Sequence, residues 1–167
     1  MLSGTCRHWE AGHAIVDVNG VGYGVDIPFK AGDSAPFEAG EPVSLWIHTH
    51  VRENGIKLFG FAQRQEQQTF EALLSVNGVG PRLALAILSH LTPVALADIA
   101  ARDSHADLKA IPGVGVTGAK KIILGIKSKL EKLGLSGAAV DTQDAVRQGA
   151  QATWDPQLRS DLNSALV

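Results

Sequence analysis

The chain changes its hydrophobic period once, near Gln63. Before that point apolar residues alternate with polar ones, from Tyr23 to Ile27 and again from Val43 to Val51. Alternation with a period of two indicates strands that bury one face. Beyond Gln63 the apolar residues recur at spacings of three and four, which indicates amphipathic helices. We therefore expect a β domain over residues 1–63 and a helical domain over residues 64–133.

Turn signals divide the β domain into short strands. Asn19–Gly20 separates one pair of apolar runs, and Asn54–Gly55 separates another. An Asn-Gly pair is a strong hairpin signal because a tight turn needs residues that tolerate positive φ. Several short strands joined by glycine-rich turns are typical of a small barrel, and the OB fold is the type most often associated with nucleic acids. We therefore predict an OB-fold β-barrel.

The segment after the helical domain predicts a linker and one more short helix. Residues 134–154 begin with a Gly-, Ser- and Ala-rich stretch and continue as a polar run, which is typical of a flexible linker. Asp155 followed by Pro156 is a helix-start signal, so we expect a short helix within residues 155–167. One helix cannot bury its own apolar face, so this segment is expected to dock elsewhere or to be the remnant of a longer domain. The predicted fold class is α+β, with the barrel first and an all-α domain second.

Composition narrows the classes of function. The chain has 167 residues and is 45% hydrophobic, which is enough for a real core. It contains no apolar run of about 20 residues, and Met1–Glu10 lacks the apolar segment of a secretory signal, so no membrane association is expected. The single cysteine, Cys6, cannot form an internal disulfide. This fits a reducing compartment, and we expect a cytoplasmic protein.

The formal net charge of −2 hides a basic segment. Between residues 109 and 132 the one acidic residue, Glu131, stands against six lysines: Lys109, Lys120, Lys121, Lys127, Lys129 and Lys132. Such a cluster can be the footprint of a phosphate-bearing partner. On charge alone, a solvated helix face explains it equally well.

The helical domain contains an internal repeat with an offset of 35 residues. Val76–Pro81 aligns with Ile111–Val116, and each segment has the pattern of a glycine hairpin. The flanking apolar residues also align: Leu73 with Leu108, Ala84 with Ala119, Ile87 with Ile122, and Leu88 with Ile123. Each unit is therefore a helix, a glycine hairpin and a second helix, which is the helix-hairpin-helix pattern.

This pattern predicts a phosphate-binding site in each unit. Paired glycines let the chain turn tightly and place no Cβ in front of the N–H groups that begin the next helix. Those N–H groups and the positive end of the helix dipole attract a phosphate oxygen. The candidate DNA-phosphate contacts are Gly78, Val79 and Gly80 in the first unit and Gly113, Val114 and Gly115 in the second. Arg82, Lys120 and Lys121 are expected to add full positive charges.

Binding of this kind is expected to be indifferent to base sequence and sensitive to salt, because main-chain amides contact phosphates and not bases.

A glycine hairpin can also be only a tight connection between antiparallel helices. Two copies in register favour the phosphate-binding interpretation. Two other functions stay open on the residues alone: the DNA-gripping portion of a nuclease or ligase, and a helical module for protein interaction.

No catalytic residue, cofactor or metal site is expected. The chain has no phosphate-binding loop of the ATPase type and no cluster of acids for two-metal chemistry. His48 and His50 share a strand face, but without a third ligand nearby we expect a solvated face there. For the aromatic residues Trp9, Trp46 and Phe59 we expect core packing in preference to base stacking.

Four segments resemble the RuvA family, in its order and at its spacing. They are Val16–Tyr23, His50–Phe61, Asn77–Leu88 and Ile111–Gly115, and the third is the most specific. The resemblance covers about residues 14–133. It implies an OB-fold domain, a domain with two helix-hairpin-helix motifs, and a small third domain on a flexible linker.

The resemblance also implies a function and partners. Members of the family form a homotetramer, or two tetramers face to face, that holds a four-way Holliday junction open for branch migration in recombination and repair. The implied partners are junction DNA and a RuvB-type ATPase, and a junction resolvase is a further candidate. The turn after Arg52 is implied to be an acidic pin at the junction centre, which places Glu53 and Asn54 there.

The chain departs from the family pattern in the pin and at both ends. The pin usually has two adjacent acids, whereas here Glu53 is followed by Asn54. Met1–Arg7 follows the family's opening strand only loosely. Residues 155–167 correspond only to the beginning of the third, ATPase-binding domain.

A further departure lies in the second hairpin. The family usually has two lysines directly after the glycines, but Val116–Thr117 occupies those positions here. Lys120 and Lys121 come one helical turn later and are expected to compensate in part.

Overall fold

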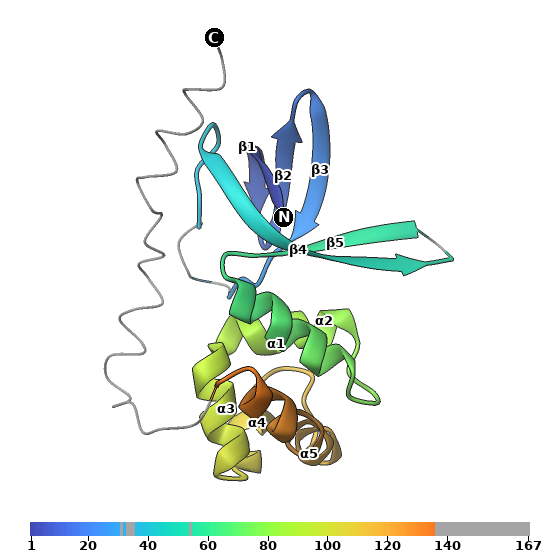
Figure 1. The fold of residues 1–167 in the computed structure, drawn as a ribbon, viewed down its shortest axis with the longest axis vertical. Coiled ribbons are helices and arrows are strands. Elements are labelled where there is room, and N and C mark those ends of the chain that lie inside the picture. The colour runs from blue at the N-terminus through green and yellow to red at the C-terminus, as the bar shows by residue number, and fades with distance from the viewer. Residues whose placement is uncertain (31, 33–35, 54, 136–167) are drawn as a thin grey trace.

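The structure, a computed structural model of the chain, describes residues 1–30, 32, 36–53 and 55–135. Within these residues a five-stranded barrel is followed by five helices (Figure 1). Three of the sequence predictions lie outside the described residues. They are Asn54 of the pin, most of the predicted linker, and the predicted helix within residues 155–167.

The barrel is closed, and its strands neighbour one another in the order β1, β2, β3, β5, β4. The strands are β1 (Leu2–Glu10), β2 (His13–Val18), β3 (Val21–Asp26), β4 (Pro42–Arg52) and β5 (Gly55–Phe61). The pair β3 and β5 is parallel, and the other neighbouring pairs are antiparallel. This OB-like barrel confirms the predicted fold of the first domain. It also shows that the loosely matching N-terminus forms a barrel strand, because β1 pairs with both β2 and β4.

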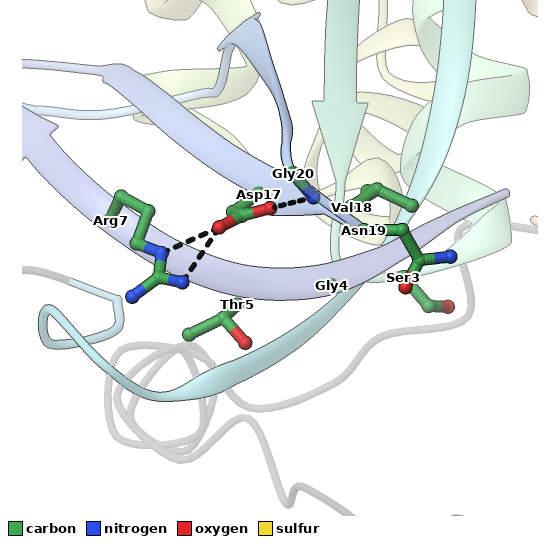
Figure 2. A pocket seen from close by; sticks show the side chains of 8 residues that line it. All are labelled: Ser3, Gly4, Thr5, Arg7, Asp17, Val18, Asn19 and Gly20. Carbon is green, nitrogen blue, oxygen red and sulfur yellow. Dashed lines mark hydrogen bonds and ion pairs between the residues drawn. The ribbon is translucent and has the colours of Figure 1, made fainter.

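The turn between β2 and β3 has the conformation that its Asn-Gly sequence predicts. Asn19 has φ 51° and Gly20 has φ 89°. The Asp17 carboxylate accepts the Gly20 N–H at 2.8 Å and the Arg7 Nε–H at 2.8 Å (Figure 2). The hydrogen bond from Arg7 is the main reason that the pKa of Asp17 is lowered. The pocket drawn in Figure 2 therefore contains two opposite charges, Arg7 and Asp17, that already pair with each other.

The helices begin and end at residues whose chemistry favours those positions. They are α1 (Arg64–Leu74), α2 (Pro81–His90), α3 (Pro93–Ala101), α4 (His105–Lys109) and α5 (Val116–Lys132). Pro81 and Pro93 open α2 and α3, because proline suits the first helical turn, where no N–H is needed. The Thr92 hydroxyl caps α3 by accepting the Ala95 N–H at 3.2 Å.

The helical domain extends two residues beyond the predicted boundary. The predicted linker begins at residue 134, but Gly134 has φ 73° and reverses the chain at the end of α5. The Leu135 N–H then donates to the Leu130 carbonyl at 3.0 Å, and the Leu135 side chain is buried in the core. A glycine in this conformation commonly ends a helix, and the apolar residue after it packs back on the last turn.

The barrel has a hydrophobic core cluster of its own, and the core of the helical domain extends into the barrel through β5. Phe59 and Phe61 of β5 belong to the same buried cluster as Phe70 of α1. The Phe70 ring centroid lies 5.1 Å from that of Phe59 and 5.0 Å from that of Phe61. In Figure 1, α1 lies directly against the β4–β5 hairpin. The two domains are therefore packed together and are not joined by a tether alone.

Two main-chain to side-chain hydrogen bonds also cross this junction between the domains. The Gln67 side-chain amide donates to the Ile47 carbonyl at 2.7 Å. The Phe29 N–H donates to the Ser89 hydroxyl at 2.9 Å. These bonds fix the orientation of α1 and α2 relative to the barrel.

Gly125 on α5 lets that helix pack closely on the first glycine hairpin. A Cβ at Gly125 would lie 2.8 Å from Val76 Cγ2, which is closer than side chains tolerate. We expect Gly125→Ala to lower the free energy of unfolding by about 1–3 kcal/mol, because overpacking displaces Val76. Chemical denaturation measures this, with Gly118→Ala as the matched control. The same helix leaves open space at Gly118, so that variant is expected to be stabilised by up to about 1 kcal/mol, and equal effects would contradict the packing argument.

Candidate nucleic-acid interface

The two glycine hairpins have matching backbone conformations. Gly78 has φ 89° and Gly113 has φ 90°, so each turn uses the left-handed conformation that favours glycine. Two residues later, Gly80 and Gly115 are the N-caps of α2 and α5, with φ −93° and −82°. The repeat seen in the sequence is therefore a structural repeat of the two hairpins.

The valine between each pair of glycines has a structural role within its hairpin. The Val79 N–H donates to the Val76 carbonyl at 3.0 Å, and the Val114 N–H donates to the Ile111 carbonyl at 3.1 Å. Both valine side chains are buried, with 9% of Val79 and 7% of Val114 exposed. The Val79 and Val114 amides are thus engaged within the hairpins and their side chains lie in the core, while contact of these two residues with phosphate stays a prediction. These residues close the hairpin and anchor it in the core.

The glycine amides, in contrast, are available to a ligand. The N–H groups of Gly78, Gly80, Gly113 and Gly115 donate to no acceptor in the described part of the chain. The three glycines Gly78, Gly113 and Gly115 are exposed, and Gly80 is half-buried. A Cβ at Gly78, Gly80 or Gly115 would meet nothing within 4 Å. Unpaired donors with open space in front of them are what a phosphate oxygen requires.

The two hairpins lie side by side. A Cβ at Gly113, in the second hairpin, would be 3.4 Å from Leu83 Cδ1, in the first turn of α2. The N-terminus of α2 therefore adjoins the turn that leads into α5.

Three predicted cationic side chains accompany these helix ends. Arg82 is exposed in the first turn of α2, and Lys120 and Lys121 are exposed on α5. Within the described residues none of the three forms an ion pair. Lys120 is four residues beyond Val116, or about 6 Å along the helix axis. Helical side chains lean toward the N-terminus, so both lysines can approach a phosphate held there.

The β4–β5 hairpin projects from the barrel beside the helical domain (Figure 1). Glu53 is exposed in its turn, as a pin requires. At the end of β4, the Arg52 Nε–H donates to His50 Nε2 at 2.8 Å. Because Nε2 accepts this bond, it carries no proton. Partial burial, with Arg52, His48 and Lys57 nearby, lowers the pKa of His50.

The histidine face of β4 is not the solvated face that the sequence predicted. The side chain of His48 is only 20% exposed, and its Nδ1 lies 3.1 Å from a carboxylate oxygen of Glu71 on α1. Its ring centroid is 5.3 Å from that of Phe70. His48 therefore helps to join the barrel to α1, a contact between distant segments that strand periodicity does not reveal.

The aromatic residues pack as predicted. Trp9 contacts Phe29 and Phe37 edge to face, with centroid distances of 5.3 and 5.4 Å. Phe59 is buried, and Arg64 lies over the ring of Trp46. These rings hold the protein core and the domain junction together.

Over residues 1–30, 32, 36–53 and 55–135 no group of three His, Cys, Asp or Glu side chains could hold a metal ion. In the same residues no single helix is long and apolar enough to cross a bilayer. The pair α2 and α3 reaches that length and composition only together, across a bend of 94°.

Comparison with known proteins matches both domains and the whole chain. Residues 1–60 match the family model for the RuvA N terminal domain, and residues 70–128 match the model for the SAM-like helix-hairpin-helix tandem. A relative from Geobacter sp. (strain M21) is 41% identical over 167 residues, covering 100% of this chain and 80% of the relative. A relative from Pelobacter propionicus is 45% identical over 140 residues, covering 84% of this chain and 70% of the relative. Both are named Holliday junction branch migration complex subunit RuvA. The chain belongs to the RuvA family.

The segments that first suggested RuvA fall on four turns of the structure. Val16–Tyr23 forms the β2–β3 turn, and His50–Phe61 forms the β4–β5 hairpin. Asn77–Leu88 and Ile111–Gly115 form the two glycine hairpins with the start of α2. These are the places where the RuvA pattern prescribes backbone conformation, so they are recognisable in the sequence.

Other residues beside the RuvA hairpins were missed by sequence reasoning. Arg52 and Lys57 lie on one face of the β4–β5 hairpin, next to Arg82 of α2. The alternation of His48, His50 and Arg52 along β4 was a usable signal for a polar face. What that face lies against depends on the packing of β5 on α1, which the alternation does not contain.

Proposed function

We propose that this chain is a non-catalytic scaffold that binds four-way DNA junctions for branch migration driven by a RuvB-type ATPase. The observation that carries the proposal is the pair of adjacent hairpins with free, exposed amides at Gly78, Gly80, Gly113 and Gly115. Free amides at helix N-termini bind phosphate oxygens. The names of the relatives, which are subunits of a Holliday junction branch migration complex, support the choice of ligand.

Specificity for a junction comes from geometry in this proposal. Amide contacts to phosphates do not discriminate between bases, so one chain alone reads only the backbone. We propose a homotetramer, or two tetramers face to face, that presents the hairpins to four DNA arms at once. Glu53 then lies near the centre as the pin, where like charges repel the phosphates of the crossing strands.

The proposed partners follow from the same assembly. The scaffold is proposed to have no nucleotide site, so the partner ATPase drives the movement of the DNA. In the family, the ATPase contact belongs to the third domain, and we propose that residues 155–167 correspond to the beginning of that domain. A junction resolvase is a further proposed partner. We place the protein in the cytoplasm, where bacterial DNA and the ATPase are found.

A binding competition tests this function. The full chain is titrated against a four-way junction and a linear duplex with the same arm sequences, at two salt concentrations. We expect the junction to bind at least roughly a hundredfold more tightly, since specific complexes exceed non-specific ones by such factors or more. Both affinities are expected to fall with salt, by a slope of about 0.9 per phosphate contact.

Each other outcome assigns a different function. Equal affinity for junction and duplex would favour the DNA-gripping portion of a nuclease or ligase. No binding to either DNA would favour a module for protein interaction. Either result would overturn the proposal.

A further inference from the structure

The lysines of the basic segment, residues 109–132, divide into two groups in the structure. The four exposed lysines are Lys109, Lys120, Lys121 and Lys132. Lys127 and Lys129 are half-buried, and Lys127 Nζ lies 3.8 Å from a carboxylate oxygen of Asp103. Lys129 Nζ donates a hydrogen bond to the Ser75 hydroxyl. Two of the six lysines therefore make contacts within the protein, and the segment is not one uniform phosphate footprint.

Ser75 lies between α1 and the first glycine hairpin. It is the C-cap of α1, and its N–H donates to the Glu71 carbonyl at 3.2 Å. Its hydroxyl donates to the Ala72 carbonyl and accepts the hydrogen bond from Lys129. The last turn of α1 contains no basic residue of its own. Because carbonyls at a helix C-terminus attract positive charge, Lys129 of α5 stabilises the end of α1 from which the hairpin starts.

The same helix, α5, also packs on the next residue of the chain. A Cβ at Gly125 would lie 2.8 Å from Val76 Cγ2, so the α5 backbone comes close to Val76. Gly125 and Lys129 are four residues apart and therefore lie on the same face of α5. This face contacts two consecutive residues, Ser75 and Val76, at the entrance to the first hairpin. Because α5 begins directly after the second hairpin, the helix connects the second hairpin to the first.

The second hairpin is held in a different way. The residue that corresponds to Ser75 in the repeat is Ala110, the C-cap of α4, which has no hydroxyl. The second hairpin adjoins Leu83 of α2, whose Cδ1 lies 3.4 Å from the position of a Cβ at Gly113. Each hairpin is thus next to a helix of the other unit, and the polar bridge belongs to the first hairpin.

The spacing of the two hairpins matters for the proposed phosphate contacts. Phosphates follow one another at set intervals along DNA, so the amides of both hairpins meet phosphates at the same time only when the hairpins keep one separation. A binding surface that already has this arrangement binds more tightly than one that the ligand must order. The bond between Lys129 and Ser75 restricts the movement of the first hairpin relative to α5.

We propose that Lys129 is a positioning residue that holds the first phosphate site at a set distance from the second through Ser75. Lys129 does not contact the DNA itself. This inference rests on the proposed function, since the spacing matters only when both hairpins hold DNA. It gives one lysine of the basic segment a role that its charge alone does not reveal.

The experiment removes the bridge from either end. Lys129→Gln removes the charged donor, Ser75→Ala removes the acceptor, and the double variant removes both. Lys129→Arg keeps a cation with N–H donors at the same position. The control is Arg102→Gln, which removes one positive charge and breaks the ion pair of Arg102 with Asp98 at the end of α3, outside both hairpins. The full chain is titrated with a fluorescein-labelled four-way junction at several salt concentrations, and anisotropy reports binding.

We expect Lys129→Gln and Ser75→Ala each to lose about tenfold in junction affinity, because the first hairpin must then be ordered on binding. The double variant is expected to lose no more than about twofold beyond either single variant, since both changes remove the same bond. The salt slope is expected to stay unchanged, because a lost phosphate contact would lower it by about 0.9 per subunit. Lys129→Arg and Arg102→Gln are expected to bind within roughly threefold of the wild type.

The outcomes separate this inference from the proposed function. Wild-type protein that does not bind the junction would overturn the scaffold function and the positioning role with it. A wild type that binds, together with an equal affinity of Lys129→Gln, would overturn the positioning role alone. The same follows from a loss in Lys129→Gln that Ser75→Ala does not share, or that comes with a lower salt slope, because Lys129 would then contact a phosphate directly. Losses that add in the double variant, or a Lys129→Arg protein as weak as Lys129→Gln, would also contradict the role.

Circular dichroism checks that each variant folds. Should Lys129→Gln fail to fold, Ser75→Ala is compared with Ser128→Ala, a change of an exposed serine on α5. The loss of affinity is then expected in Ser75→Ala alone, and equal affinities of the two variants would overturn the positioning role.

Discussion

Gly80→Ala combined with Gly115→Ala is expected to remove most junction binding from a protein that remains folded. Both glycines have negative φ, which any residue adopts, and a Cβ at either position meets open space. The added methyl groups would stand where a phosphate oxygen must approach the amides. A hydrogen bond to a charged group is worth about 1.5–3 kcal/mol, so two lost contacts correspond to roughly a hundredfold or more in affinity. In a tetramer the loss is repeated in every subunit.

Anisotropy titration with a labelled junction measures this effect, and thermal unfolding checks the fold. Alanine is a poorer N-cap than glycine, so each substitution is expected to cost up to about 1 kcal/mol of stability. Gly78→Ala and Gly113→Ala are the informative comparison, because φ 89° and 90° would strain an alanine at either position. Those variants are expected to lose both stability and binding. A folded Gly80→Ala, Gly115→Ala protein with unchanged affinity would remove the amide contacts from the proposal.

Phe70→Ala is expected to lower the free energy of unfolding by about 3–5 kcal/mol, the usual cost of removing a fully buried aromatic ring. Phe70 is 0% exposed and contacts Phe59 and Phe61 of the barrel as well as the helical core. The cavity would therefore lie between the two domains and weaken both. Leu124→Ala is the control, since this side chain is 84% exposed and its loss is expected to change stability by less than about 0.5 kcal/mol.

Two signals followed during urea unfolding distinguish one cooperative unit from two. In a Trp154→Phe background, tryptophan fluorescence reports on Trp9 and Trp46 in the barrel, and circular dichroism reports on the helices. Because the core of the helical domain extends into the barrel, we expect Phe70→Ala to shift both transitions to lower urea together. A shift in the helical signal alone would mean that the domains unfold independently.

Sequence reasoning succeeded where a feature depends on local backbone chemistry. Gly78 and Gly113 were identified because a left-handed turn requires glycine, and the repeat showed that the requirement occurs twice. Gly134 has the same preference at the end of α5, but it was assigned to the linker. Its role as a helix end depends on Leu135 finding a place in the core, and a sequence pattern does not show that place.

Val79 and His48 are two residues whose surroundings the sequence did not predict. Val79 lies between two correctly identified glycines, yet its amide is used inside the hairpin and its side chain is buried. His48 was expected to face solvent, and it contacts Glu71 and Phe70 of α1. In both cases the strand or turn was right, but the surroundings of the side chain are formed by segments elsewhere in the chain.

The amino-acid sequence by itself determined the order of elements, the two glycine hairpins and the membership of a junction-binding family. These features follow from side-chain periodicity and from the φ values that glycine alone adopts freely, and both are local properties. Only the tertiary structure decided which amides remain free, that the two hairpins adjoin, and that Arg52 and Lys57 face Arg82 across a groove. The last of these depends on the packing of β5 against α1 through Phe59, Phe61 and Phe70. Contacts between segments far apart in the chain are set by the shape of the whole core, and no local pattern encodes them.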